Sequence, residues 1–152
     1  EEILKFLVLY FIVLRRSEFN EPMDGIVYGV VVSLGFATFE NYDYVFRLAE
    51  TWDIDPAQMA IWRSYSAVPM HGLNGCIMGF YFGMYAFTSD KKYLIFSLLM
   101  PFLLHGFYNF LGHPVHLLVV IGMLAYTIVL HSNLKKLQLK KKNESESLKI
   151  WE

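Results

Sequence analysis

The sequence predicts an all-α fold: a polytopic transmembrane helical bundle of at least five helices. The 152-residue chain is 55% hydrophobic and 18% charged, whereas soluble domains average about 25% charged residues. Its apolar residues gather in five runs, and the last four approach or exceed the roughly 20 residues that a bilayer-spanning helix needs. Ionisable residues also recur inside these runs, and they recur at similar depths.

The first apolar run, Ile3–Leu14, would be only about 18 Å long as a helix. The chain starts without Met, so we expect a truncated N-terminus and a continuation upstream. The next runs are 25–46, 59–87, 93–111 and 115–130. We expect residues 1–134 to form the membrane core and residues 135–152 to form a basic, partly disordered tail.

Basic residues predict the orientation of the bundle. If the runs alternate, Arg15-Arg16, Lys91-Lys92 and the Lys-rich stretch 135–142 all fall on one side. The positive-inside rule places that side in the cytoplasm, which predicts a multi-pass cell-membrane protein with a cytoplasmic C-terminus. The basic tail would lie against anionic lipid. No basic face with interleaved aromatic residues suggests nucleic-acid binding.

Small residues recur at every fourth position on two of the predicted helices. Such rows let helix backbones approach closely in lipid, so these faces should point into the bundle. Pro69 should bend the second of these helices near His71. One row comprises Gly25, Gly29, Ser33, Ala37 and Asn41, and the other comprises Ala67, His71, Gly75, Gly79 and Gly83.

Polar residues of four predicted helices fall in one layer, roughly 20–28 Å from the cytoplasmic ends at 1.5 Å per residue. These residues are the Glu1-Glu2 pair, Glu40, His71, and His105 with Asn109. A charged group in the bilayer costs roughly 2.5–3.5 kcal/mol, so the carboxylates need partners. The sequence offers Lys5 and Asn41 as partners, whereas Arg63, near the outer end of its helix, suggests a snorkelling residue or a gate.

This set of side chains suggests a hydrolytic site. A buried carboxylate can accept a proton from water, a histidine can hold that water, and His105 with Asn109 can donate to an oxyanion. No Gly-x-Ser-x-Gly elbow is present, and the single cysteine, Cys76, suits packing. Zinc bound by Glu40, His71 and His105 is the alternative, but His-Glu-x-x-His is absent, so no cofactor is favoured.

At these residues the chain resembles the PrsW family of intramembrane proteases, which is related to the CAAX-protease and bacteriocin-processing superfamily. Four ordered motifs over about residues 1–112 carry the resemblance. They are Glu1-Glu2-Ile3-Leu4-Lys5, Phe36-Ala37-Thr38-Phe39-Glu40-Asn41, Pro69-Met70-His71 and His105-Gly106-Phe107-Tyr108-Asn109.

The resemblance implies an endopeptidase that cleaves membrane-anchored protein substrates. Glu1 or Glu2 would activate water, and His105 and Asn109 would stabilise the oxyanion. CAAX-type relatives carry His where this chain has Glu40, so that residue could be a base, a water holder or a ligand. Members have also been described as metalloproteases. The alternatives outside proteolysis are a non-catalytic scaffold or chaperone-like relative and a proton-coupled transporter.

Overall fold

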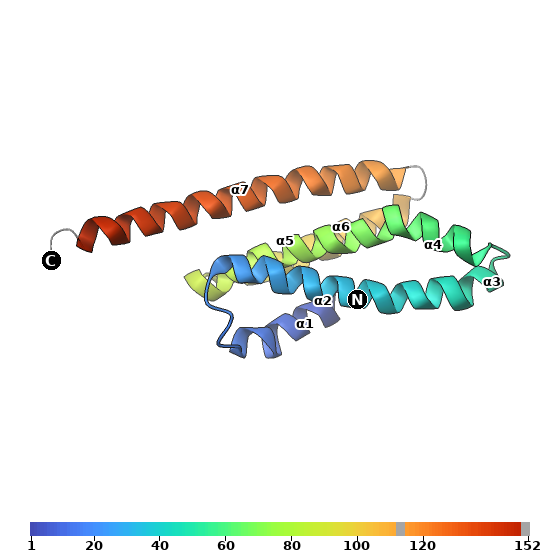
Figure 1. The fold of residues 1–152 in the computed structure, drawn as a ribbon, viewed down its shortest axis with the longest axis horizontal. Coiled ribbons are helices and arrows are strands. Elements are labelled where there is room, and N and C mark those ends of the chain that lie inside the picture. The colour runs from blue at the N-terminus through green and yellow to red at the C-terminus, as the bar shows by residue number, and fades with distance from the viewer. Residues whose placement is uncertain (112–114, 150–152) are drawn as a thin grey trace.

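The computed structural model describes residues 1–111 and 115–149, with side chains described up to residue 139 apart from 112–114. Every regular element in this part of the chain is helical, which confirms the all-α class. The longer helices run roughly parallel or antiparallel in an elongated bundle (Figure 1). The elements are α1 Glu2–Phe11, the 3₁₀ turn η1 Val13–Arg15, α2 Pro22–Asp43, the π-helical turn η2 Tyr44–Leu48, α3 Ala49–Thr51, α4 Pro56–Tyr65, α5 Ala67–Thr88, α6 Lys91–Leu111 and α7 Val115–Lys149.

The described residues support part of the prediction of at least five membrane-spanning helices. Three helical stretches are long and apolar enough to cross a bilayer: Pro22–Thr51, Lys91–Leu111 and Val115–Leu139. α1 has only 10 residues, which is about half of a span. α5 is long enough but carries His71, Asn74 and a glycine row on its buried face, and these residues make it less apolar.

The predicted third run divides into α4 and α5 at Ser66, whose φ of −118° and ψ of −69° interrupt the helix. Pro69 was expected to bend one continuous helix near His71. This prediction is wrong about the place, because the helix is interrupted at Ser66. A proline ring clashes with the carbonyl four residues earlier and lacks an N–H group, but both properties are tolerated in a first turn. Pro69 therefore lies in the first turn of α5, and the break precedes it.

The predicted small-residue rows face into the bundle, as expected, and the structure shows that they meet each other in the contact between α2 and α5. Gly25, Gly29, Ser33 and Ala37 are all buried on α2. A Cβ atom at Gly29 would lie 2.9 Å from the Cα of Gly79, so only glycine permits this approach. The Ser33 hydroxyl donates to the His71 carbonyl oxygen at 2.6 Å, which ties the two backbones together beside the polar layer.

The other helices pack around α5. Leu9 and Val13 of the α1 region pack with Met78 and Phe82 of α5 in one buried cluster. α7 contributes Val120, Met123, Leu130 and Leu134 to a second cluster with α5, and the Tyr126 hydroxyl contacts that of Tyr81. α7 continues past residue 134 without a break, so the predicted boundary at 134/135 is not marked by a helix end; residues 150–152 lie outside the described part.

The basic segments lie at one end of the bundle. The connections from α1 to α2 and from α5 to α6, and the C-terminal half of α7, share the left end of Figure 1, whereas the α3–α4 turn lies at the right. At the start of α6, Asp90 accepts a hydrogen bond from the Lys92 backbone N–H at 3.0 Å. The Lys92 side chain hydrogen-bonds to the same carboxyl group and lowers the pKa of Asp90.

Replacing Gly79 with alanine should separate α2 from α5, because the new Cβ would lie 2.7 Å from the Gly25 carbonyl carbon and 2.9 Å from the Ile26 Cα. We expect a loss of about 1–3 kcal/mol in the free energy of unfolding, measured by denaturation in detergent. Gly35→Ala is the matched control, since a Cβ at Gly35 meets nothing within 4 Å. Equal stability of the two variants would contradict this packing.

Candidate active site

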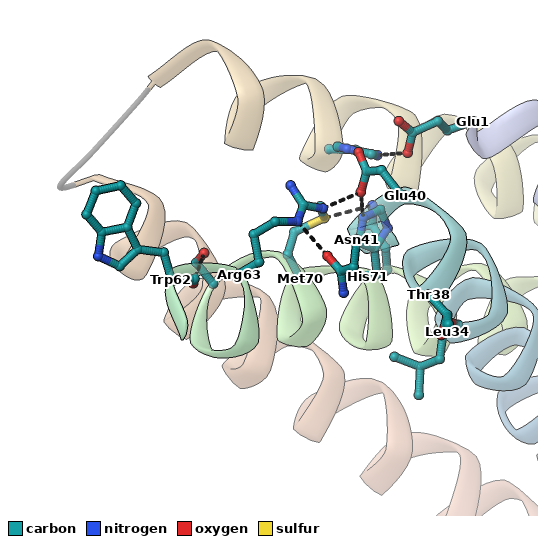
Figure 2. A network of polar contacts seen from close by, with 12 residues as sticks. Glu1, Leu34, Thr38, Glu40, Asn41, Trp62, Arg63, Met70 and His71 are labelled. Atoms are coloured by element: carbon teal, nitrogen blue, oxygen red, sulfur yellow. Dashed lines mark hydrogen bonds and ion pairs between the residues drawn. The ribbon is translucent and has the colours of Figure 1, made fainter. Parts of the chain in front are cut away.

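The polar layer of the sequence folds into one connected network of side chains. It receives Glu1, Glu2 and Lys5 from the start of the chain and α1, Glu40 and Asn41 from α2, Arg63 from α4, His71 from α5 and His105 from α6. Helices far apart in sequence thus converge on one place. The part of the network around Glu40 is shown in Figure 2.

The inner half of the network centres on Glu2. Its Oε1 accepts hydrogen bonds from Lys5 Nζ at 2.7 Å and from His105 Nδ1 at 2.8 Å. All three residues are buried. Glu1 lies at the rim, with Oε2 3.9 Å from Lys5 Nζ and 3.6 Å from His105 Nδ1 and with one third of its side chain exposed. The two adjacent glutamates therefore have different surroundings.

The outer half of the network centres on Glu40. Its Oε2 accepts from Arg63 Nη2 at 2.6 Å and lies 2.8 Å from His71 Nε2. Arg63 Nε donates to Asn41 Oδ1 at 2.5 Å, so one guanidinium holds two neighbouring residues of α2 (Figure 2). The guanidinium also lies over the Tyr44 ring, 3.8 Å from its centroid. Tyr44 begins the π-helical turn η2, and such turns are frequent at functional sites.

His71 connects the two halves. Its Nδ1 lies 3.0 Å from Lys5 Nζ, and its Nε2 contacts Glu40. An ammonium group only donates, so Nδ1 accepts and Nε2 carries the proton given to Glu40. A carboxylate only accepts, so His105 donates from Nδ1 to Glu2. The hydrogen-bond network thus assigns a proton to one nitrogen of each ring.

One oxygen of the Glu2 carboxylate is free. Glu2 Oε2 is buried, and no hydrogen-bond partner for it exists among the described residues. A buried oxygen without a partner is costly, and it marks a place where a further group can bind. The same carboxylate is held rigidly through Oε1 by Lys5 and His105. The arrangement therefore leaves one oxygen of a fixed carboxylate open to a further hydrogen-bond donor.

Most of the predicted site residues meet in this network, but Asn109 does not join it. Asn109 lies one helical turn beyond His105 on α6 and is exposed. Glu1, Glu2, His71 and His105 offer ligand-type atoms that all lie within 4.8 Å of one another. Glu40 is not a member of this group and reaches it through His71. The grouping therefore differs from the predicted set of Glu40, His71 and His105.

Two aromatic residues at the site were not predicted. Lys5 Nζ lies 4.9 Å from the centroid of the Phe36 ring, and Arg63 covers Tyr44. Phe36 and Tyr44 are four residues before and four residues after Glu40. Residues four apart share a helix face, so this spacing could have indicated that both aromatic residues lie near Glu40. A cation over an aromatic face gains about 0.5–2 kcal/mol, which helps to hold both cations in the site.

The family described as "PrsW family intramembrane metalloprotease" matches residues 1–132. Protease PrsW of Geobacillus kaustophilus is 46% identical over 113 residues, which cover 73% of this chain and 47% of the relative. Protease PrsW of Bacillus subtilis is 44% identical over 114 residues, covering 73% and 49%. Protease PrsW of Clostridioides difficile is 34% identical over 143 residues, covering 91% and 59%.

The chain thus spans about half the length of the curated relatives that it matches. No solved structure matches it significantly. The family match covers most of the chain and includes every residue of the polar network. The chain therefore belongs to the PrsW family of intramembrane proteases.

Proposed function

We propose that the whole protein hydrolyses peptide bonds of membrane-anchored protein substrates, with Glu2 as the general base. The observation that carries this proposal is the asymmetry of the Glu2 carboxylate. Oε1 is fixed by two donors, whereas Oε2 is buried and unpartnered. A carboxylate held in this way can take a proton from a water molecule as that water attacks a carbonyl carbon.

Glu2 then passes the proton to the leaving amine when the tetrahedral intermediate collapses. The remaining residues have supporting roles in this proposal. Asn109 lies on the same helix as His105 but is exposed and outside the network, so we assign it no part in this step. His105 donates from Nδ1 to Glu2. It can donate to an oxyanion at the same time only from its second ring nitrogen, Nε2, and only when both nitrogens are protonated. Glu40 orients His71 and does not contact Glu2 directly.

The residues do not fit a metal ion as they are folded here, although the family's description includes one. Two histidines and a carboxylate are a common zinc set, and the group Glu1, Glu2, His71 and His105 has suitable spacing. However, Lys5 occupies Nδ1 of His71, and Glu40 binds its Nε2. We therefore propose glutamate-type water activation. Elemental analysis and chelator sensitivity of the active protein separate it from zinc chemistry.

We also propose that the end of the bundle with the basic segments faces the cytoplasm, so that the C-terminus is cytoplasmic. The shared location of these segments supports this orientation (Figure 1), because the positive-inside rule then applies to all of them together. The site would lie toward the opposite side of the membrane, where substrate segments would enter from the bilayer.

Replacing Glu2 with glutamine should remove the base while keeping a similar shape. We expect cleavage of a membrane-anchored reporter by the whole protein in liposomes to fall by at least about 100-fold. Glu40→Ala and His105→Ala should also lose activity. Glu50→Gln is the control, because Glu50 is exposed on α3. Activity like that of the wild type in the three site variants would refute the proposal.

Arg63 should be a positioning residue, which a pair of stability measurements can test. Arg63→Met leaves Glu40 without its cation and should cost about 1–3 kcal/mol of unfolding free energy. Arg63→Met combined with Glu40→Met should recover most of this stability but remain inactive.

The control is Arg47→Met, which breaks the exposed pair with Asp43 and should cost under about 1 kcal/mol. Full cleavage activity in the double variant would show that the Arg63–Glu40 pair serves stability alone.

A further inference from the structure

Lys5 lies in the middle of the group of ligand-type side chains. Its Nζ is 2.7 Å from Glu2 Oε1, 3.0 Å from His71 Nδ1 and 3.9 Å from Glu1 Oε2. These three residues belong to the four that could hold a metal ion, and the fourth, His105, shares Glu2 Oε1 with Lys5. The Lys5 side chain is only 1% exposed, so its ammonium is a fixed part of the site.

The hydrogen bonds of this ammonium use electron pairs that a metal ion would need. A histidine ligates a metal through an unprotonated ring nitrogen. Lys5 takes the electron pair of His71 Nδ1, and His71 Nε2 is protonated toward Glu40. His105 Nδ1 carries a proton for Glu2. Neither of these Nδ1 atoms is free to bind a metal while the network persists.

The two more deeply buried carboxylates of the network already have one cation each: Lys5 pairs with Glu2 and Arg63 pairs with Glu40. The third carboxylate, Glu1, is one third exposed at the rim and lies 3.9 Å from the same Lys5 ammonium. A divalent ion beside the Lys5 ammonium would add two positive charges at a distance of a few ångströms. In a medium of low dielectric constant such like-charge repulsion is large. Metal and ammonium therefore compete for the same place.

We propose that Lys5 is the resident cation of this site, and that its ammonium keeps divalent metal ions out of an otherwise complete ligand group. Removal of this one charge converts Glu1, Glu2, His71 and His105 into a metal-binding site. The proposal deepens the glutamate-type mechanism proposed above, since both rest on the contacts of His71 with Lys5 and Glu40, but its test measures metal binding without any cleavage. A failure of either proposal can therefore be recognised separately.

The test measures zinc bound to the whole protein in detergent, by equilibrium dialysis against zinc followed by elemental analysis. Lys5→Met keeps the length of the side chain and removes its charge. We expect it to bind about one zinc ion per chain, at least about tenfold more tightly than the wild type. Adding His105→Ala to Lys5→Met should abolish this binding, which assigns the ion to this site.

Two variants serve as controls. Lys5→Arg keeps a cation in the site, and Lys92→Met removes an exposed ammonium that pairs with Asp90 outside the network. Both should bind as little zinc as the wild type. Zinc bound by the wild type as tightly as by Lys5→Met would overturn the proposal, as would a folded Lys5→Met protein that stays free of zinc.

If Lys5→Met does not fold, the wild type alone decides the question. Ligands that bind only the folded state raise the unfolding temperature. We expect micromolar zinc to leave the unfolding temperature of the wild type unchanged. A rise with zinc that His105→Ala abolishes would show that the ammonium does not exclude the metal, and would refute the proposal.

Discussion

The buried ion pair between Lys5 and Glu2 is the interaction on which the site depends. Both side chains are almost fully buried, at 1% and 3% exposure, and a charge in such a place is stable only when it is paired and hydrogen-bonded. The pair lies on α1, which has 10 residues. Lys5 reaches His71 on α5, and Glu2 reaches His105 on α6. The ion pair thereby fixes a short helix against two others.

The hydrogen bond between His71 and Glu40 depends on the close packing of α2 against α5 through glycine residues, which have no side chains. Because α2 and α5 meet through Gly25, Gly29, Gly75 and Gly79, the two backbones come close enough for Glu40 and His71 to hydrogen-bond across the interface. Bulkier residues would separate the helices and lengthen this contact. Where water is scarce, polar groups on different helices must hydrogen-bond to one another. The polar network therefore needs the close helix approach that the glycine rows allow.

The sequence predicted the helical class, the small-residue interface and most members of the network, because these follow from periodicity and depth along each helix. Depth does not determine how each helix is rotated, however. Asn109 matched His105 in spacing but is exposed, and Lys5 pairs with His71 across 66 positions of sequence. Three of the described helical stretches have both the length and the composition of a membrane span, whereas α5 has the length but carries polar and glycine residues on its buried face.

The most direct test of this account is a double-mutant cycle between Lys5 and Glu2, using Lys5→Met, Glu2→Gln and the double variant. The quantity measured is the free energy of unfolding in detergent. If the pair holds α1 in place, the unfolding free energy lost in the double variant should be smaller than the sum of the losses in the two single variants, by at least about 1.5 kcal/mol. Losses that add to within about 0.5 kcal/mol would contradict the central place of this ion pair.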